Sequence, residues 1–276
     1  MKNKLYVIPK FVLLIIFSFF ALFPFYLLIN SSFKSQSELY QAPYSIVKNP
    51  TIENYITAWV EGKFYIFAKN SVIVLVVSVF FIVLLSSMAA FAITRRGTFP
   101  KFNNFIYILF LIGVFIPPQV AIIPLYLFLI RINLGNSLIG LCIALIAYGI
   151  PFGIFIMYNY FRQIPKEIED AAKIDGCSNF SLYSKIIMPL SKSSIITVAL
   201  IQGVWVWNNL IFTLVIISST RLKTLPTGLL AFKGQFVTNF PPIFAGVMLI
   251  SAPLILVFFI LQKQYMEGMI LGSIKG

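Results

Sequence analysis

Residues 70–94 read NSVIVLVVSVFFIVLLSSMAAFAIT and contain no Asp, Glu, Lys or Arg. An α-helix rises about 1.5 Å per residue, so about 20 apolar residues cross the hydrocarbon core of a bilayer, which is about 30 Å thick. This stretch is long enough for one comfortable crossing and too short for two. It therefore predicts a transmembrane helix.

Five further stretches have a similar length and a similar scarcity of charge. Together they predict six transmembrane helices in an all-α polytopic membrane protein, with one transmembrane domain over residues 1–276. The expected spans lie at about 11–30, 71–93, 104–129, 137–160, 194–217 and 243–263.

The composition excludes several other classes of protein. Apolar residues make up 59% of the chain and charged residues 11%, whereas soluble domains have about half and about a quarter. The net charge is +13, but the basic residues flank long uncharged stretches instead of gathering on one face, which argues against nucleic acid. The chain has no His and only two Cys, Cys142 and Cys177, so we expect no metal, disulfide or cofactor.

The distribution of basic residues predicts the orientation. If the N-terminus is cytoplasmic, 13 of the 21 Lys and Arg residues lie inside and eight lie outside. The positive-inside rule then favours cytoplasmic termini at both ends. Four lysines in the first external loop weaken the asymmetry, namely Lys34, Lys48, Lys63 and Lys69.

Residues 162–192 form the cytoplasmic loop between spans four and five and hold four of the eight acidic residues. Pro165 suits the first turn of a helix and Gly176 suits its end. Glu167, Glu169 and Asp170 lie where the helix dipole favours anions. The pattern predicts a helix of about 11 residues.

A second helix is expected directly after this glycine. Ser178 can cap its N-terminus, and Pro189 can end it. Three apolar residues at helical spacing are expected to form one stripe, namely Phe180, Tyr183 and Ile187. The loop is thus predicted to be structured.

Three functions compete for this loop: a DNA-binding helix-turn-helix, an amphipathic linker on the lipid surface, and a surface that docks on a soluble partner. The balance of five basic and four acidic residues argues against DNA. Ala171, Ala172 and Gly176 allow another surface to approach closely, which a linker does not need. The residues alone leave docking and the linker equally supported.

The loop resembles the EAA loop of permease subunits in binding-protein-dependent ABC importers. The matching pattern is Asp170-Ala171-Ala172, then Gly176, then Ile186 and Pro189, with Asp170 where the family usually has Glu and Met188 where it usually has Leu. Further matches are Asn54-Tyr55, Asn70-Ser71, Pro117-Pro118-Gln119, Pro151-Phe152-Gly153, Trp207-Asn208 and the ending 268–276. The ending is similar to the carbohydrate-type subfamily, in particular the second permease of maltose-type systems.

This resemblance implies a permease subunit in the cell membrane that forms a sugar path together with a second, related permease. It also implies two cytoplasmic ATPases, an extracytoplasmic solute-binding protein, and a last external loop, from Thr224 to Pro242, near that protein. The implied ATPase-docking residues are Glu167, Asp170, Ala171, Ala172, Gly176, Ile186 and Pro189. The chain has no phosphate-binding Gly-x-x-x-x-Gly-Lys-Ser/Thr motif, so ATP hydrolysis is expected in a partner and not in this chain.

Polar residues in span five are candidates for the solute path. On a continuous helix, Gln202, Trp205, Asn208 and Asn209 share one side and Trp207 points away. An indole that stacks on a sugar ring, beside amides that bond to hydroxyls, suits a sugar. Hydrogen bonding between helices around Gly203 explains the same residues equally well.

Other solutes and other classes of protein also remain open. Permeases of this kind also handle polyols and glycerol phosphate. A self-sufficient secondary transporter or an intramembrane enzyme is less favoured, because the spans hold no acid and no His, and only Arg131 lies near membrane depth. Pro117-Pro118, Pro124 and Pro151 are expected to bend their helices, and the carbonyls that they free are alternative linings of a cavity.

Overall fold

The computed structural model describes residues 7–95, 100–235 and 239–273, and every regular element in these ranges is a helix. Of the basic residues that orient the chain, Lys2, Lys4, Arg96 and Lys275 lie outside the described residues. The chain forms two compact units: unit 1 comprises residues 1–65 and 228–255, and unit 2 comprises residues 66–227 and 256–276.

Unit 1 is built around long apolar helices. Its elements are α2 (Val7–Ser32), α3 (Gln36–Gln41), α4 (Glu53–Val60), the start of α5 (Phe64–Arg95), most of α14 (Leu225–Gln235) and the first part of α15 (Pro241–Ser273). No residue in the most hydrophobic 18-residue window of α2 is buried. So large an exposed apolar surface is typical of a helix that faces lipid.

The connection from α2 to α4 is held by buried polar side chains. Asn30 accepts a hydrogen bond from the Val47 N–H (2.8 Å) and donates to the Ser45 carbonyl (2.7 Å). Asn54 donates to the carbonyls of Ser32 and Lys34, both at 2.8 Å. Because these amides satisfy backbone groups of an irregular loop, they order it without regular structure.

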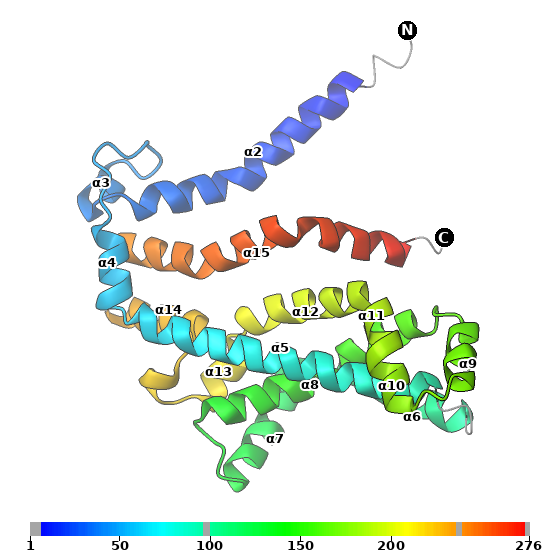
Figure 1. Ribbon diagram of the computed structural model, residues 1–276. Helices are drawn as coiled ribbons and strands as arrows, with labels where there is room; N and C mark the ends of the chain where they lie inside the picture. Colours follow the sequence, from blue (N-terminus) through cyan, green and yellow to red (C-terminus); the bar gives the residue numbers. More distant parts are fainter. Residues whose placement is uncertain (1–6, 96–99, 236–238, 274–276) are drawn as a thin grey trace. The chain divides into compact units, whose positions relative to one another are not determined.

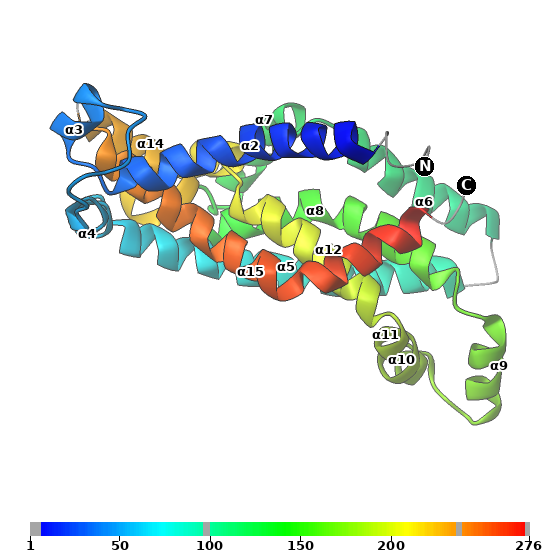
Figure 2. The ribbon, with the colours of Figure 1, turned by 90° about the horizontal axis from the view of Figure 1, so that it is seen from above.

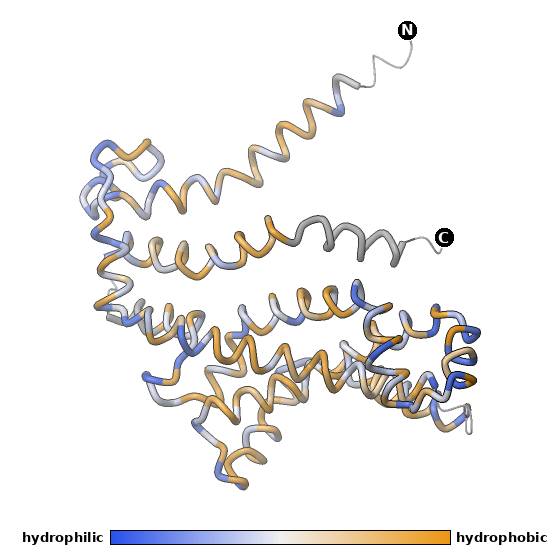
Figure 3. The backbone as a smooth tube through the Cα atoms, in the orientation of Figure 1, coloured by the Kyte–Doolittle hydropathy of each residue, from blue (hydrophilic) through white to orange (hydrophobic). Residues whose placement is uncertain are grey.

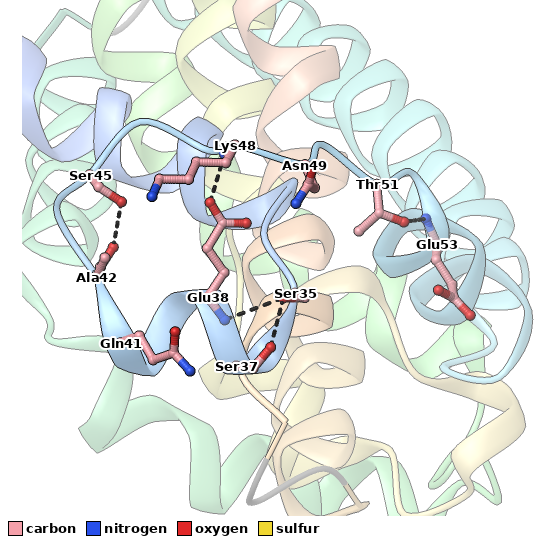
Figure 4. Close-up of a pocket in the computed structure, with 10 residues that line it drawn as sticks. All are labelled: Ser35, Ser37, Glu38, Gln41, Ala42, Ser45, Lys48, Asn49, Thr51 and Glu53. Carbon is pink, nitrogen blue, oxygen red and sulfur yellow. Dashed lines mark hydrogen bonds between the residues drawn. The ribbon is translucent and has the colours of Figure 1, made fainter.

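This connection also surrounds an open polar cavity of about 420 Å³ (Figure 4). Glu38 extends into it and accepts a hydrogen bond from the Lys48 N–H (2.6 Å), while Ser35 caps α3 by accepting from the Glu38 N–H. Its lining is formed by Ser35, Ser37, Glu38, Gln41, Ala42, Ser45, Lys48, Asn49, Thr51 and Glu53.

Unit 2 is a helical bundle with α8 at its centre. Its elements are most of α5, then α6 (Pro100–Phe115), α7 (Pro118–Arg131), α8 (Leu138–Phe161), α9 (Lys166–Ile174), α10 (Asn179–Ser181), the π-helix η1 (Leu182–Ile187), α11 (Met188–Leu190), α12 (Lys192–Trp207), α13 (Ile211–Ile216) and the 3₁₀ helix η2 (Thr220–Leu222). Helix α8 packs against α6 and α12. Gly149 and Gly153 bring it close to α5, since a Cβ on either glycine would clash with Ile82 or Ser86.

Long apolar helices confirm a polytopic membrane protein. Among the described residues, four helices are long and apolar enough to cross a bilayer: Pro9–Ser32, Phe64–Arg95, Leu138–Phe161 and Pro241–Ile260. Two further apolar helix pairs are bent, which allows up to six crossings.

The span expected at 104–129 is one of these bent pairs. Helices α6 and α7 meet at 103°, with Pro117 and Pro118 at the break. The bend predicted at these prolines is confirmed, because proline lacks the N–H that a continuous helix requires. Pro124 and Pro151 lie inside α7 and α8 without a break.

Span five differs from the continuous helix expected over 194–217. Helix α12 ends at Trp207, and α13 begins only at Ile211. The other bent pair joins Asn179–Leu190 to α12 at 76°. The polar residues after Trp207 therefore do not continue the helical rotation of Gln202 and Trp205.

Candidate functional site

Helix α9 begins and ends at the predicted signals. Pro165 has extended backbone (φ −57°, ψ 138°) and precedes the helix, which has Glu167 and Glu169 in its first turn. At the other end Gly176 has φ +75°. The Cys177 N–H bonds to the Ala172 carbonyl (2.9 Å) and the Gly176 N–H to the Lys173 carbonyl (3.0 Å), which is a Schellman motif. The helix has nine residues instead of about 11.

The second helix begins as predicted but continues differently. The Ser178 hydroxyl accepts a hydrogen bond from the Ser181 N–H (3.2 Å), which confirms the cap. Residues 182–187 then form a π-helix, whose i→i+5 bonds change the angular spacing of side chains. Tyr183 and Ile187 are buried, but Phe180 is 71% exposed. Phe180 nevertheless contacts the Tyr183 ring, with centroids 6.5 Å apart, so it forms the exposed end of the predicted stripe.

Helices α9, α10 and α11 lie beyond one end of α8 and α12 (Figures 1 and 2). The tube is mostly hydrophobic along α5 and α8, whereas in α9 hydrophilic positions alternate with hydrophobic ones (Figure 3). Such a change is typical of a segment that leaves the hydrocarbon region.

The outer face of α9 is defined here as Glu167, Asp170, Ala171 and Ile174. All four side chains are exposed, Ile174 by 87%. Their spacing of three, four and seven positions places them on one side of a helix. Ile174 was missed from sequence, although an apolar residue at this spacing from Glu167 was the available signal.

The remaining predicted docking residues do not all share this face. Ala172 is buried in the core of unit 2, Ile186 is half-buried, and Pro189 is exposed. Gly176 is exposed, and no described atom lies within 4 Å of the position that a Cβ would take. Space therefore remains outside Gly176 for another surface.

The inner face of α9 carries a charge that sequence reasoning left out of the site. Glu169 is buried and forms an ion pair with Arg95, the last residue of α5. A pairing between residues so distant in sequence has no local signal. An arginine that ends a long apolar helix was the only indication.

Gln202 and Trp205 both face α8, but in different surroundings. Gln202 is buried and its Nε2 donates to the Gly149 carbonyl (3.4 Å). This geometry favours the interhelical hydrogen bond that the sequence left open for Gln202. Trp205 is half-buried and stacks on Tyr148, with ring centroids 5.3 Å apart and planes at 18°.

Asn208 and Asn209 lie at the break after α12. The Asn208 Nδ2 donates to the Val204 carbonyl (2.9 Å), and the side chain is exposed. The Asn209 Oδ1 accepts from the Phe212 N–H (3.1 Å), which satisfies a free donor in the first turn of α13. Trp207, which was expected on the opposite side of the helix from the polar stripe, is buried.

Tyr148 contacts both the α6–α7 break and the region of the α12–α13 break, and it was also missed from sequence. Its hydroxyl donates to the Ile116 carbonyl (2.8 Å), at the break between α6 and α7. Its ring contacts Trp205 and also Phe212, with a centroid distance of 5.5 Å to the latter, and the Trp205 and Phe212 rings contact each other at 6.0 Å. Non-helical backbone at membrane depth is tolerated where protein or a water-filled cavity surrounds it. Tyr148 supplies part of that surrounding.

Comparison with known proteins places the chain in a family. Residues 82–269 match the family model described as binding-protein-dependent transport system inner membrane component. A Caldicellulosiruptor sp. protein described as an ABC transporter permease, ORF2, is 39% identical over 269 residues, 96% of each chain. The arabinooligosaccharides transport system permease protein of Halalkalibacterium halodurans is 32% identical over the full length of both chains.

A solved structure shares the fold. It is the crystal structure of a bacterial ABC transporter involved in the import of the acidic polysaccharide alginate. The TM-score is 0.83 over 95% of this chain and 97% of that chain, at 22% identity. The chain belongs to the family of inner membrane components of binding-protein-dependent transport systems.

Proposed function

We propose that this chain is one of two permease subunits of an ATP-driven importer for a sugar or oligosaccharide. An external binding protein delivers the solute, and two cytoplasmic ATPase subunits supply the energy. Both chain termini are cytoplasmic in this proposal, in line with the excess of basic residues on that side.

The outer face of α9 carries this proposal. It combines two carboxylates, an alanine that permits close approach and an exposed isoleucine, and this mixture suits a protein surface better than a lipid headgroup layer, which favours Lys and Arg. Gly176 and Phe180, which follow this face along the chain, are also exposed. The ATPase is proposed to dock there, with Ile186 and Pro189 at its edge and Ala172 supporting α9 from within.

The proposed solute path includes Trp205, Asn208 and Asn209, at the break after α12. Backbone groups released at a helix break, together with an aromatic ring and amides, suit a ligand rich in hydroxyl groups. Gln202 was a further candidate on sequence grounds; its bond to Gly149 makes it the member that supports the wall from behind.

Reconstitution tests the proposal. The chain is placed in proteoliposomes with its partner permease and ATPase, and uptake of labelled arabinotriose is measured with the cognate binding protein and ATP. Uptake that requires both additions supports the proposal. Uptake by the chain alone, driven by an ion gradient, would establish a secondary transporter instead. Uptake of labelled glycerol 3-phosphate in place of any sugar would establish the non-sugar alternative.

A further inference from the structure

Three helix ends of unit 2 meet at one guanidinium group. Arg95 is the last residue of α5, and its Nη1 pairs with Glu169 in the first turn of α9. Its Nη2 donates to the carbonyl of Phe161, the last residue of α8, at 2.6 Å. The side chains of Arg95 and Glu169 are 10% and 6% exposed.

This arrangement uses features that only arginine offers. The planar guanidinium presents several N–H donors in a fixed fork, so one side chain bonds to a carboxylate and a carbonyl at once. The last carbonyls of a helix lack partners within the helix and attract positive charge. Arg95 meets that need at the end of α8.

A buried ion pair does not by itself indicate that its role is to stabilise the fold. Removing two charges from water opposes their attraction, and well-packed apolar pairs often serve equally well. What an ion pair adds is a directional link that fails when either partner moves away. The ends of α5 and α9 are therefore held in a defined register.

The covalent connection between α8 and α9 does not by itself set this register. It consists of residues 162–165, of which Ile164 is buried while the other three side chains are exposed. Beside the ion pair lies a cavity of about 200 Å³, lined also by Phe91, Ala92, Lys173, Asn179 and Leu182. Because space remains there, packing leaves α9 room to tilt, and the ion pair opposes that tilt.

We propose that Arg95 and Glu169 are positioning residues that lock α9 to the ends of α5 and α8. A force on the outer face of α9 is then passed to two long helices instead of being lost in a local tilt. This inference rests on the proposed function, in which an ATPase docks on that face. The interlock sets how much solute moves for each ATP hydrolysed.

The first test separates stability from coupling. Glu169→Met leaves the Arg95 charge buried without its partner, so the yield of assembled complex should fall. The double variant Arg95→Met with Glu169→Met removes both charges and should restore the yield. We expect the double variant to hydrolyse ATP when the loaded binding protein is added, but to import several-fold less solute per ATP. An unchanged solute-to-ATP ratio would overturn the inference.

A second variant covers the case in which the double variant fails to assemble. Glu169→Gln keeps the size of the side chain and its hydrogen-bond acceptor and removes only the charge. It should assemble and also show a lowered solute-to-ATP ratio. A wild-type ratio in this variant, with the double variant unassembled, would show that the pair serves assembly only. Thr94→Val is the matched control, because the Thr94 hydroxyl bonds to the Ala90 and Phe91 carbonyls within α5.

A third measurement distinguishes failure of the interlock from failure of the proposed function. Amide hydrogen exchange over residues 166–175 is followed in the purified chain without ATPase. Exchange should be faster in the double variant and unchanged in Thr94→Val. If the double variant exchanges like the wild type, the interlock is refuted. If its exchange is faster but the wild-type chain never binds the ATPase, the interlock stands and the docking proposal fails.

Discussion

At the scale of single residues, Lys34 is a buried charge of unit 1. Its side chain is 0% exposed, and its Nζ donates to the Ala42 carbonyl (2.7 Å), the Pro43 carbonyl (3.2 Å) and the Ser45 hydroxyl (3.4 Å). The three N–H donors of an ammonium group match these three acceptors. The lysine therefore orders the loop that surrounds the polar cavity.

Lys34→Met should destabilise this loop. It removes the ammonium group that joins the Ala42 and Pro43 carbonyls and the Ser45 hydroxyl, and a lost hydrogen bond to a charged group costs about 1.5–3 kcal/mol. We expect a lower melting temperature of the purified complex and faster proteolysis within residues 34–54. Lys48→Met is the control, since the Lys48 side chain is exposed. Equal melting temperatures and equal proteolysis for the two variants would contradict this role of Lys34.

Gly176 permits a test of partner contact that is independent of packing within this chain. Its positive φ penalises a Cβ, and asparagine tolerates that backbone better than alanine. If only the backbone mattered, Gly176→Asn would transport better than Gly176→Ala. We expect the reverse, because the larger side chain projects into the space proposed for the ATPase. Gly176→Asp should abolish uptake while the chain still inserts, as measured by uptake and by immunoblots of membranes.

At the scale of helices, features set by neighbouring residues can be predicted from sequence, whereas features set by contacts between distant residues cannot. The ends of α9 and the break at Pro117-Pro118 follow from residues that act on their own backbone, so the sequence predicts them. The break after Trp207 contains neither Pro nor Gly. It is accompanied by the local Asn209 cap, three residues before its Phe212 donor, and by the stack of Trp205 on Tyr148, which lies far away in the sequence.

Two substitutions of Asn209 separate its structural and solute-binding roles. Asn209→Ser keeps a side-chain oxygen able to cap α13 but removes the Nδ2 donor. It should preserve assembly and lower uptake by about tenfold, if the lost bond of about 1.4 kcal/mol falls on the translocation barrier. Asn209→Leu should lower assembly as well, because the Phe212 N–H loses its acceptor. Normal uptake by an assembled Asn209→Ser variant would assign Asn209 to helix capping alone.

Tyr148→Phe tests whether the α6–α7 break and the α12–α13 break act together. The variant keeps the stack on Trp205 but leaves the Ile116 carbonyl without its hydroxyl donor. We expect assembly at the normal level and several-fold slower uptake, because the carbonyl at the α6–α7 break loses its hydrogen bond to α8. Phe212→Leu, which leaves the Ile116 bond in place, serves as the comparison. The link is refuted if Tyr148→Phe takes up solute as fast as the wild type.

At the scale of the whole molecule, composition and the charge-free runs were sufficient for the class of protein, because both describe the solvent that the chain requires. They count apolar length without regard to bends, so they do not distinguish a straight crossing from the bent α6–α7 pair. The Arg95–Glu169 pair was invisible for a different reason. Neither residue departs from its local pattern, and only their meeting at the ends of α5 and α9 gives them a shared role.

Cysteine labelling decides the orientation of the whole chain. Cys142 and Cys177 are first replaced by serine, and single cysteines are placed at Tyr40 or Lys185, both of which have exposed side chains. With cytoplasmic termini, an impermeant maleimide should label position 40 in intact cells, and position 185 only after the membrane is permeabilised. This orientation follows from the excess of basic residues on the cytoplasmic side, although the four lysines of the first external loop reduce that excess. The reverse labelling pattern would place the outer face of α9 outside the cell, where no ATP-hydrolysing partner could reach it.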